Sequence, residues 1–162
     1  MNGQQNLNIE LEPNKKGLTS RGKIALFSLL AYVIIFLVLY ILLRKQLSQS
    51  TNPEAYKLWG AFFIKFLAFS ILATVLVTLL VKAFNPHAAD LLNDITDELD
   101  RLIELRTVKC FTGVFAAGFF LDLFTLMLWG NLNLFFHLLA LSMFAAGAAF
   151  YLLYMIQYER GY

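Results

Sequence analysis

The sequence is poor in cysteine and in charge. A single cysteine, Cys110, among 162 residues excludes an internal disulfide and any metal site built from several cysteines. Charged residues make up 15% of the chain, against about 25% in soluble domains. A formal net charge of +2 is no signature of nucleic-acid binding. Instead, 59% of the residues are hydrophobic and the mean hydropathy is +0.66. This composition predicts an integral membrane protein surrounded by the lipid bilayer.

The chain also lacks the motifs of common enzymes and cofactor proteins. It contains no Gly-rich phosphate loop, no HExxH and no GxSxG. Its two histidines, His87 and His137, are predicted on opposite sides of the membrane, so they cannot share a metal ion or a haem. We therefore expect no metal, no cofactor and no catalytic activity, and no motif ties the chain to a family.

Long apolar runs predict four transmembrane helices. The first run, 24–43, is uncharged, and a helix of that length rises about 30 Å, which is the thickness of the hydrocarbon core. Arg44 and Lys45 follow it where a signal peptide would have small residues. The predicted order is an N-terminal tail 1–20, span 24–43, an external loop 44–57, span 58–81, a helix 86–107, span 110–129, a tight turn 130–133, span 134–156 and a C-terminal tail 157–162.

The fold predicted from this order is an all-α integral membrane protein with two antiparallel hairpins. Its orientation follows from the lysines and arginines that flank the spans. Nine of them fall on the side of the two tails: Lys15, Lys16, Arg21, Lys23, Lys82, Arg101, Arg106, Lys109 and Arg160. Three fall on the other side: Arg44, Lys45 and Lys57. Because positive charge favours the cytoplasmic side, both termini are predicted in the cytoplasm.

The segment 86–107 has the pattern of an amphipathic cytoplasmic helix. Asn85 and Pro86 are a typical helix start. One stripe of the helix is apolar and is a candidate surface for docking a partner: Leu91, Leu92, Ile95, Leu99, Leu102 and Ile103. The helix either continues into the third span as a stalk or bends near Arg106 to lie on the membrane. Its acidic polar face favours the stalk, since membrane-surface helices are usually basic. The stripe serves either as a docking surface or as internal packing.

Three ionisable side chains fall inside the predicted spans: Lys65, Asp122 and His137. Asp122 lies eight residues before Gly130 and His137 lies seven after it, while Lys65 lies seven residues past Leu58, where the second span enters from the same outer side. We therefore expect all three at a similar depth. Intramembrane charges are costly and mark candidate sites. One interpretation is a structural clasp between helices, which we favour, and the other is a proton or ion relay.

Two further polar or small-residue patterns lie in the spans. Ser70, Thr74 and Thr78 recur every four residues, and hydrogen bonds to carbonyls one turn back explain this spacing better than a polar path does. Small residues that permit close helix packing occur on the third and fourth spans: Gly113, Ala117, Ser142, Ala146 and Gly147. Packing within the chain is the simpler role for them, although one small face is available to a partner helix.

These features favour a non-catalytic membrane subunit or scaffold of a larger complex, which binds other membrane subunits or itself. The alternative is a small homo-oligomeric transporter or channel that uses Asp122 with His137 and Lys65. An intramembrane enzyme is the least favoured hypothesis, because neither a nucleophile nor a second acid accompanies Asp122 and His137.

Overall fold

The described part of the protein is entirely helical in its regular structure. The computed structural model describes residues 20–49, 52–84 and 98–160. Its four helices are α1 (Ser20–Leu47), α2 (Asn52–Phe84), α4 (Glu98–Trp129) and α5 (Leu132–Arg160). All four are long and apolar enough to cross a membrane. The prediction of four such helices is confirmed, and it is consistent with a multi-pass membrane protein.

Each helix is longer than the span predicted within it. The helices contain 28 to 33 residues, or about 42–50 Å at 1.5 Å per residue. Charged side chains near their ends account for the extra length. The helix α1 continues through Arg44 and Lys45, and cations stabilise the C-terminal end of a helix. The helix α2 begins at Asn52, ahead of Pro53, which suits the first helical position. Much of the predicted 44–57 loop is therefore helical.

The connection between α4 and α5 is a turn of only two residues. Gly130 has φ +61°, a left-handed conformation that side chains other than glycine rarely adopt. Its amide donates to the carbonyl of Leu126 and closes the last turn of α4. Asn131 then caps α5, because its side-chain oxygen accepts a hydrogen bond from the amide of Leu134 at 3.1 Å. These caps hold α4 and α5 as an antiparallel hairpin.

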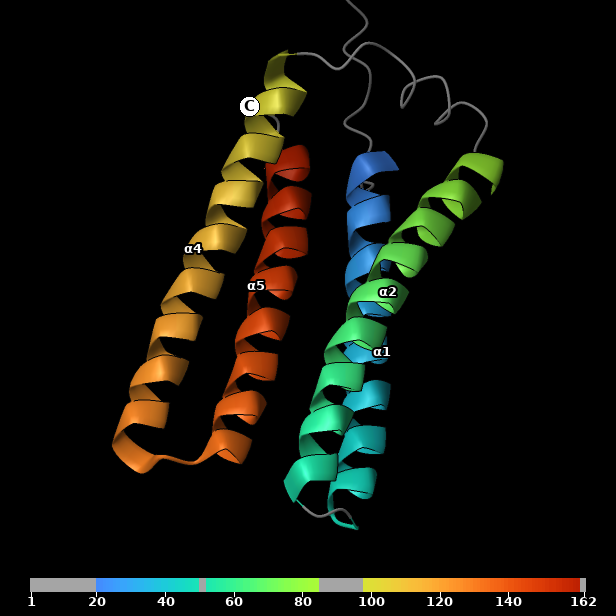
Figure 1. Cartoon of the computed structure of the whole chain (residues 1–162). Helices are drawn as coiled ribbons and strands as arrows, with labels where there is room; N and C mark the ends of the chain where they lie inside the picture. Colours follow the sequence, from blue (N-terminus) through green and yellow to red (C-terminus); the bar gives the residue numbers. More distant parts are fainter. Residues whose placement is uncertain (1–19, 50–51, 85–97, 161–162) are drawn as a thin grey trace, which may run out of the picture.

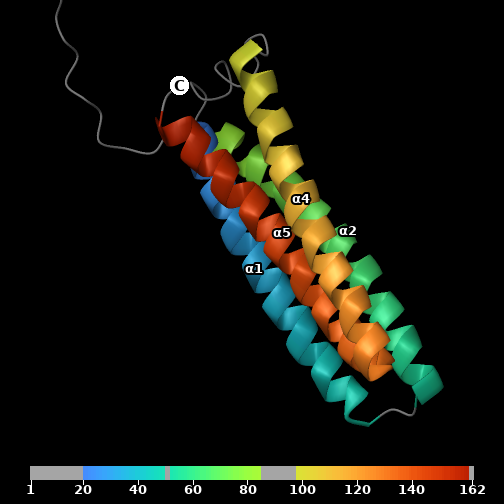
Figure 2. The same ribbon diagram turned by 90° about the vertical axis from the view of Figure 1, so that its left-hand side faces the viewer.

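The two hairpins stand side by side in one bundle (Figure 1). Close helix pairs are α1 with α2, α1 with α5 and α4 with α5. In Figure 2, α1 and α5 lie toward one side of the bundle and α2 and α4 toward the other. The α1–α2 pair and the α4–α5 pair consequently form opposite outer faces. We call the end where α1 and α4 finish the turn end, and the end where α1 begins and α5 finishes the terminal end.

The helix predicted for 86–107 is observed in part. Residues 86–97, with Leu91, Leu92 and Ile95, lie outside the described residues. From Glu98 onward the chain is one unbroken helix to Trp129, with no bend near Arg106. Within the remaining stripe, Leu102 is 51% exposed while Ile103 is 3% exposed. These two neighbours therefore do not share one environment.

The core is aromatic and sits between α1, α2 and α5. Its buried members are Tyr32, Phe36, Leu43, Trp59, Phe62, Phe66 and Ala140. Phe36 stacks on Phe144 with ring centroids 4.3 Å apart, and it meets Phe66 edge-on. Such pairs add about 0.5–1.5 kcal/mol each beyond the area that they bury. The packing fixes the rotation of α1 and α2 against α5, and so decides which side chains face outward.

Candidate functional site

His137 lies inside an aromatic enclosure at the turn end of the bundle. Its Nδ1 is 3.0 Å from the hydroxyl of Tyr40, within hydrogen-bonding distance. The ring of Trp59 meets the His137 ring edge-on with centroids 4.6 Å apart. The Trp59 indole nitrogen donates to the side-chain oxygen of Asn133 at 3.1 Å. His137 on α5 is thus joined to both α1 and α2, an arrangement that supports the clasp interpretation for this residue.

Asp122 lies on the outer side of the α4–α5 seam. Its residue is 3% exposed, and its Oδ2 atom has no hydrogen-bond partner among the described residues. The side chain of Ser142 on α5 lies beside the Asp122 carboxyl group. Beside them is a groove of 370 Å³, which we call the Asp122 groove: Gly118, Leu121, Asp122, Thr125, Leu141 and Ser142 contribute to its lining. Its outer rim includes the exposed Leu121 and Leu141.

Lys65 lies on the outer side of the α1–α2 seam. Its side chain is exposed, and it lines a shallow groove of 90 Å³, which we call the Lys65 groove: Leu39, Leu42, Gln46, Ala61, Phe62 and Lys65 contribute to it. The bundle therefore does not bring Lys65, Asp122 and His137 together. Lys65 and Asp122 occupy opposite outer faces, while His137 points into the aromatic enclosure between them (Figures 1 and 2).

The contacts between helices also give the relative depths of these residues. Gly118 faces Ser142 across the antiparallel helices α4 and α5, so Asp122, four residues after Gly118, lies about 6 Å nearer the turn end than Ser142. His137 is five residues before Ser142 on α5, about 7.5 Å nearer the turn end. Lys65 is six residues beyond Trp59, whose ring contacts His137, so Lys65 lies about 9 Å farther from the turn end than that contact. The backbones at Asp122 and His137 are therefore at nearly the same level, and Lys65 lies between one and two helical turns from them.

The small residues divide between the inside and the outside of the bundle. Gly147 faces Tyr32 and Gly118 faces Ser142, and a Cβ atom at either glycine would overlap that neighbour. Ala146 is fully buried. Gly113 and Ala117 are exposed on α4 instead, and a Cβ atom at Gly113 would meet nothing within 4 Å. Gly147, Ser142 and Ala146 therefore serve packing within the chain, and Gly113 and Ala117 do not.

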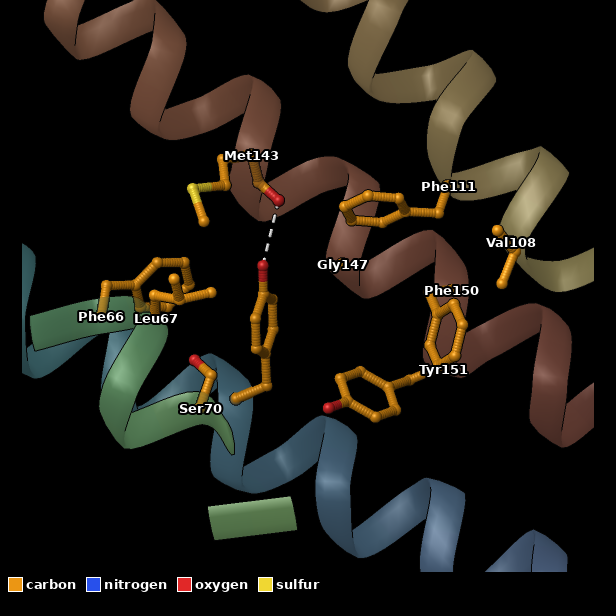
Figure 3. Close-up of a pocket in the computed structure, with 10 residues that line it drawn as sticks. Phe66, Leu67, Ser70, Val108, Phe111, Met143, Gly147, Phe150 and Tyr151 are labelled. Atoms are coloured by element: carbon orange, nitrogen blue, oxygen red, sulfur yellow. Dashed lines mark hydrogen bonds between the residues drawn. The ribbon is translucent and has the colours of Figure 1, made fainter. Parts of the chain in front are cut away.

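An apolar pocket of 270 Å³ lies at the centre of the bundle, and all four helices contribute to its lining (Figure 3). Tyr32 crosses it and donates its hydroxyl proton to the carbonyl of Met143 at 3.0 Å. The hydroxyls of Thr74 and Tyr151 lie 2.8 Å apart and link α2 to α5. The predicted carbonyl bonds of Thr74 and Thr78 are confirmed, at 2.9 and 2.8 Å. These local bonds account for the spacing of Thr74 and Thr78 without a polar path along α2.

Three side chains that were not predicted to form a site are joined to one another at the terminal end of the bundle. Arg21 on α1 forms an ion pair with Asp100 on α4. Tyr158 on α5 donates its hydroxyl proton to Asp100 at 2.9 Å and accepts a hydrogen bond from Arg21 at 3.0 Å. Asp100 is 8% exposed. Arg21 and Tyr158 are 137 positions apart, so no local pattern in the sequence could predict their contact.

The described residues offer no ready site for a metal ion, since no three of their His, Cys, Asp and Glu side chains gather in one place. The polar groups form interhelical links at both ends of the bundle. Four buried side-chain atoms have no hydrogen-bond partner among the described residues, and Oδ2 of Asp122 is the carboxylate oxygen among them: Ser28 Oγ, Ser70 Oγ, Asp122 Oδ2 and Gln157 Oε1. Compared with known proteins, the chain matches no family model, no curated protein and no solved structure.

Proposed function

We propose that this protein is a non-catalytic integral membrane subunit or scaffold of a larger membrane protein complex. Both termini would lie in the cytoplasm, as the distribution of lysine and arginine favours. The exposed small-residue face of α4, formed by Gly113 and Ala117, would receive a helix of another subunit. The aromatic and polar links between the helices would hold that face in a fixed orientation.

The observation that carries this proposal is the open space at Gly113. Exposed leucine and phenylalanine side chains suit lipid and need no protein partner. Small residues on an exposed face do nothing for lipid contact, but they let a second helix approach closely, which is the main source of helix association in membranes. Gly113 has no atom within 4 Å of a built Cβ, and Ala117 lies one turn further along the same exposed side of α4.

The test replaces Gly113 by leucine and compares it with the same replacement at Gly60. Both glycines lie in membrane-spanning helices with no neighbour within 4 Å, but Gly60 is on α2. Each variant is extracted from its native membrane in a mild detergent, and the mass of the native complex is measured. We expect Gly113→Leu to lose stoichiometric foreign subunits and Gly60→Leu to retain them. Retention in both variants would refute docking on this face.

A second candidate function, the small homo-oligomeric transporter or channel, is favoured by one observation, the unpartnered oxygen of Asp122. A buried carboxylate at membrane depth can take up a proton or a cation. The separation of Asp122 from His137 and Lys65 weakens a relay through all three within one chain. Ion-driven uptake into proteoliposomes that Asp122→Asn abolishes, with assembly unchanged, would favour transport over a scaffold.

A further inference from the structure

Lys65 and Asp122 carry opposite charges on opposite outer faces of the bundle. Lys65 lies in the groove between α1 and α2, and Asp122 lies in the groove between α4 and α5. Figures 1 and 2 show these two helix pairs on opposite sides of the molecule. One lateral face of the bundle therefore carries a cation, and the opposite lateral face carries an anion.

The two charges lie at similar depth. Gly118 on α4 faces Ser142, and Asp122 follows Gly118 by one helical turn toward the turn end. Phe66 and Leu67, the next residues after Lys65, line the central pocket together with Met143, which follows Ser142. The backbones at Lys65 and Asp122 thus differ in level by about one turn. Side chains tilt toward the N-terminus of their helix, so Lys65 leans toward the turn end and Asp122 toward the terminal end, and the long lysine stem covers the difference between two copies inserted in the same orientation.

Each group lacks what the other supplies. Asp122 is buried beside an apolar groove, and its Oδ2 atom has no partner in the described residues. Lys65 is exposed beside apolar side chains such as Leu42 and Ala61, and Gln46 is the other polar residue at its groove. Hydrocarbon solvates neither a carboxylate nor an ammonium group, so pairing is favourable for both. The long, flexible stem of lysine suits entry into a groove from outside.

We propose that copies of this chain associate head to tail in the membrane, with Lys65 of one copy bound in the Asp122 groove of the next. The carboxyl group of Asp122 turns outward to accept this ammonium group, because its Oδ2 atom is covered in the single chain, and the hydroxyl of Thr125 at the same groove offers a second acceptor. Since the contacting faces differ, the interface is heterologous: it closes into a ring if the rotation between copies permits, and otherwise it forms a row.

A second copy explains the unpartnered charge more directly than a foreign helix does. A foreign helix would have to carry a basic residue near this depth, whereas the chain already carries Lys65 within about one helical turn of it and on the opposite face. The proposal does not depend on the Gly113 face of α4. Copies joined in this way would be a multi-copy scaffold, and an Asp122 held in an ion pair would be withdrawn from proton or ion transport.

The first test is a charge exchange. Lys65→Asp, Asp122→Lys and the double variant are purified and placed in lipid nanodiscs or mild detergent, and the number of copies per particle is measured by native mass spectrometry. We expect the wild type and the double variant to self-associate. Each single variant should associate about 10- to 150-fold more weakly, the range for loss of one charge-assisted hydrogen bond. Circular dichroism checks that each variant remains helical.

The second test keeps both charges in place, so that misfolded variants cannot decide the result. In a Cys110→Ser background, Ala61→Cys, in the Lys65 groove, is mixed with Leu121→Cys, at the rim of the Asp122 groove. Oxidation should yield a heterodimer of these two variants in membranes. Gly60→Cys, on another side of α2, is the control and should give no such product with Leu121→Cys.

The outcomes separate this inference from the proposed function. A monomer, an oligomer indifferent to charge exchange, or equal cross-linking by Ala61→Cys and Gly60→Cys would each overturn the head-to-tail interface. Foreign subunits that are lost on Asp122→Lys and are not restored in the double variant would also overturn it, in favour of a foreign basic helix. None of these results bears on Gly113→Leu, which tests docking on α4 by itself.

Discussion

Gly147 is the place where the structure predicts the largest effect of adding a single methyl group. A Cβ atom there would overlap the phenol group of Tyr32, whereas a Cβ atom at Gly113 would meet nothing within 4 Å. Tyr32 has little freedom to move away, because its hydroxyl is bonded to the Met143 carbonyl at 3.0 Å and its ring stacks on Phe144 at 5.8 Å. The substitution Gly147→Ala therefore forces α5 away from α1 or displaces Tyr32.

The size of the effect follows from three contributions. Overpacking of a tight interior costs about 1–3 kcal/mol, and loss of the Tyr32 hydrogen bond costs about 0.5–1.5 kcal/mol. The better helix propensity of alanine offsets about 0.5–1 kcal/mol. We expect Gly147→Ala to lower the free energy of unfolding by about 1–3 kcal/mol. We expect Gly113→Ala, which meets no clash, to leave it unchanged or to raise it by up to about 1 kcal/mol.

The assay is unfolding in mild detergent by titration with SDS, followed by tryptophan fluorescence. Trp59 is fully buried and reports on loss of the aromatic core. A double-mutant cycle adds specificity, since replacing Tyr32 by leucine should remove most of the penalty of Gly147→Ala. Equal effects at Gly147 and Gly113, or an unchanged penalty in the Tyr32→Leu background, would refute the close approach of α1 and α5 at this point.

Three further substitutions test the links between helices by the same titration. Asp100→Asn removes the ion pair with Arg21 but keeps a polar side chain. We expect it to lower the free energy of unfolding by about 1–2 kcal/mol, between the values for exposed and buried pairs. If the same substitution cost as much in an Arg21→Gln background, the pairing would be contradicted. His137→Phe preserves the ring contact with Trp59 but leaves the Tyr40 hydroxyl unpaired, so it should cost about 1–3 kcal/mol, and Tyr40→Phe should restore most of that loss. Thr74→Val breaks the link from α2 to α5 and should cost about 0.6 kcal/mol, which is the average for such bonds in membranes; a loss several times larger would show that α2 is held mainly by polar contacts.

Local features of the sequence predicted the elements of this fold well. The four apolar runs fall within the four helices, and the pair Gly130 and Asn131 ends one helix and starts the next. Asn52 and Pro53 start α2. The sequence prediction uses the same pair of residue types, Asn85 and Pro86, as a helix start, but it places Asn52 and Pro53 in a loop. The polar residues around them obscured the boundary, since hydropathy locates the membrane core and not the ends of a helix.

The candidate site shows where prediction from the sequence stopped. The levels of Asp122 and His137 along the bundle could be predicted, because the rise per residue in a helix is constant and the short turn between α4 and α5 sets a common origin. The contacts of Tyr40 with His137 and of Arg21 with Asp100 could not, since each joins helices that are far apart in the chain. Among the small residues, Gly113 and Gly147 look alike in sequence and have opposite environments in the bundle.

Local sequence was enough to predict four helices long enough to cross a membrane and the approximate position of Lys65, Asp122 and His137 along them. The direction in which each side chain points came from tertiary packing, which placed Lys65 and Asp122 on opposite outer faces and His137 between the helices. Position along a helix depends on local backbone geometry. Rotation about its axis depends instead on which helices pack against it, and here the aromatic core of α1, α2 and α5 sets that rotation.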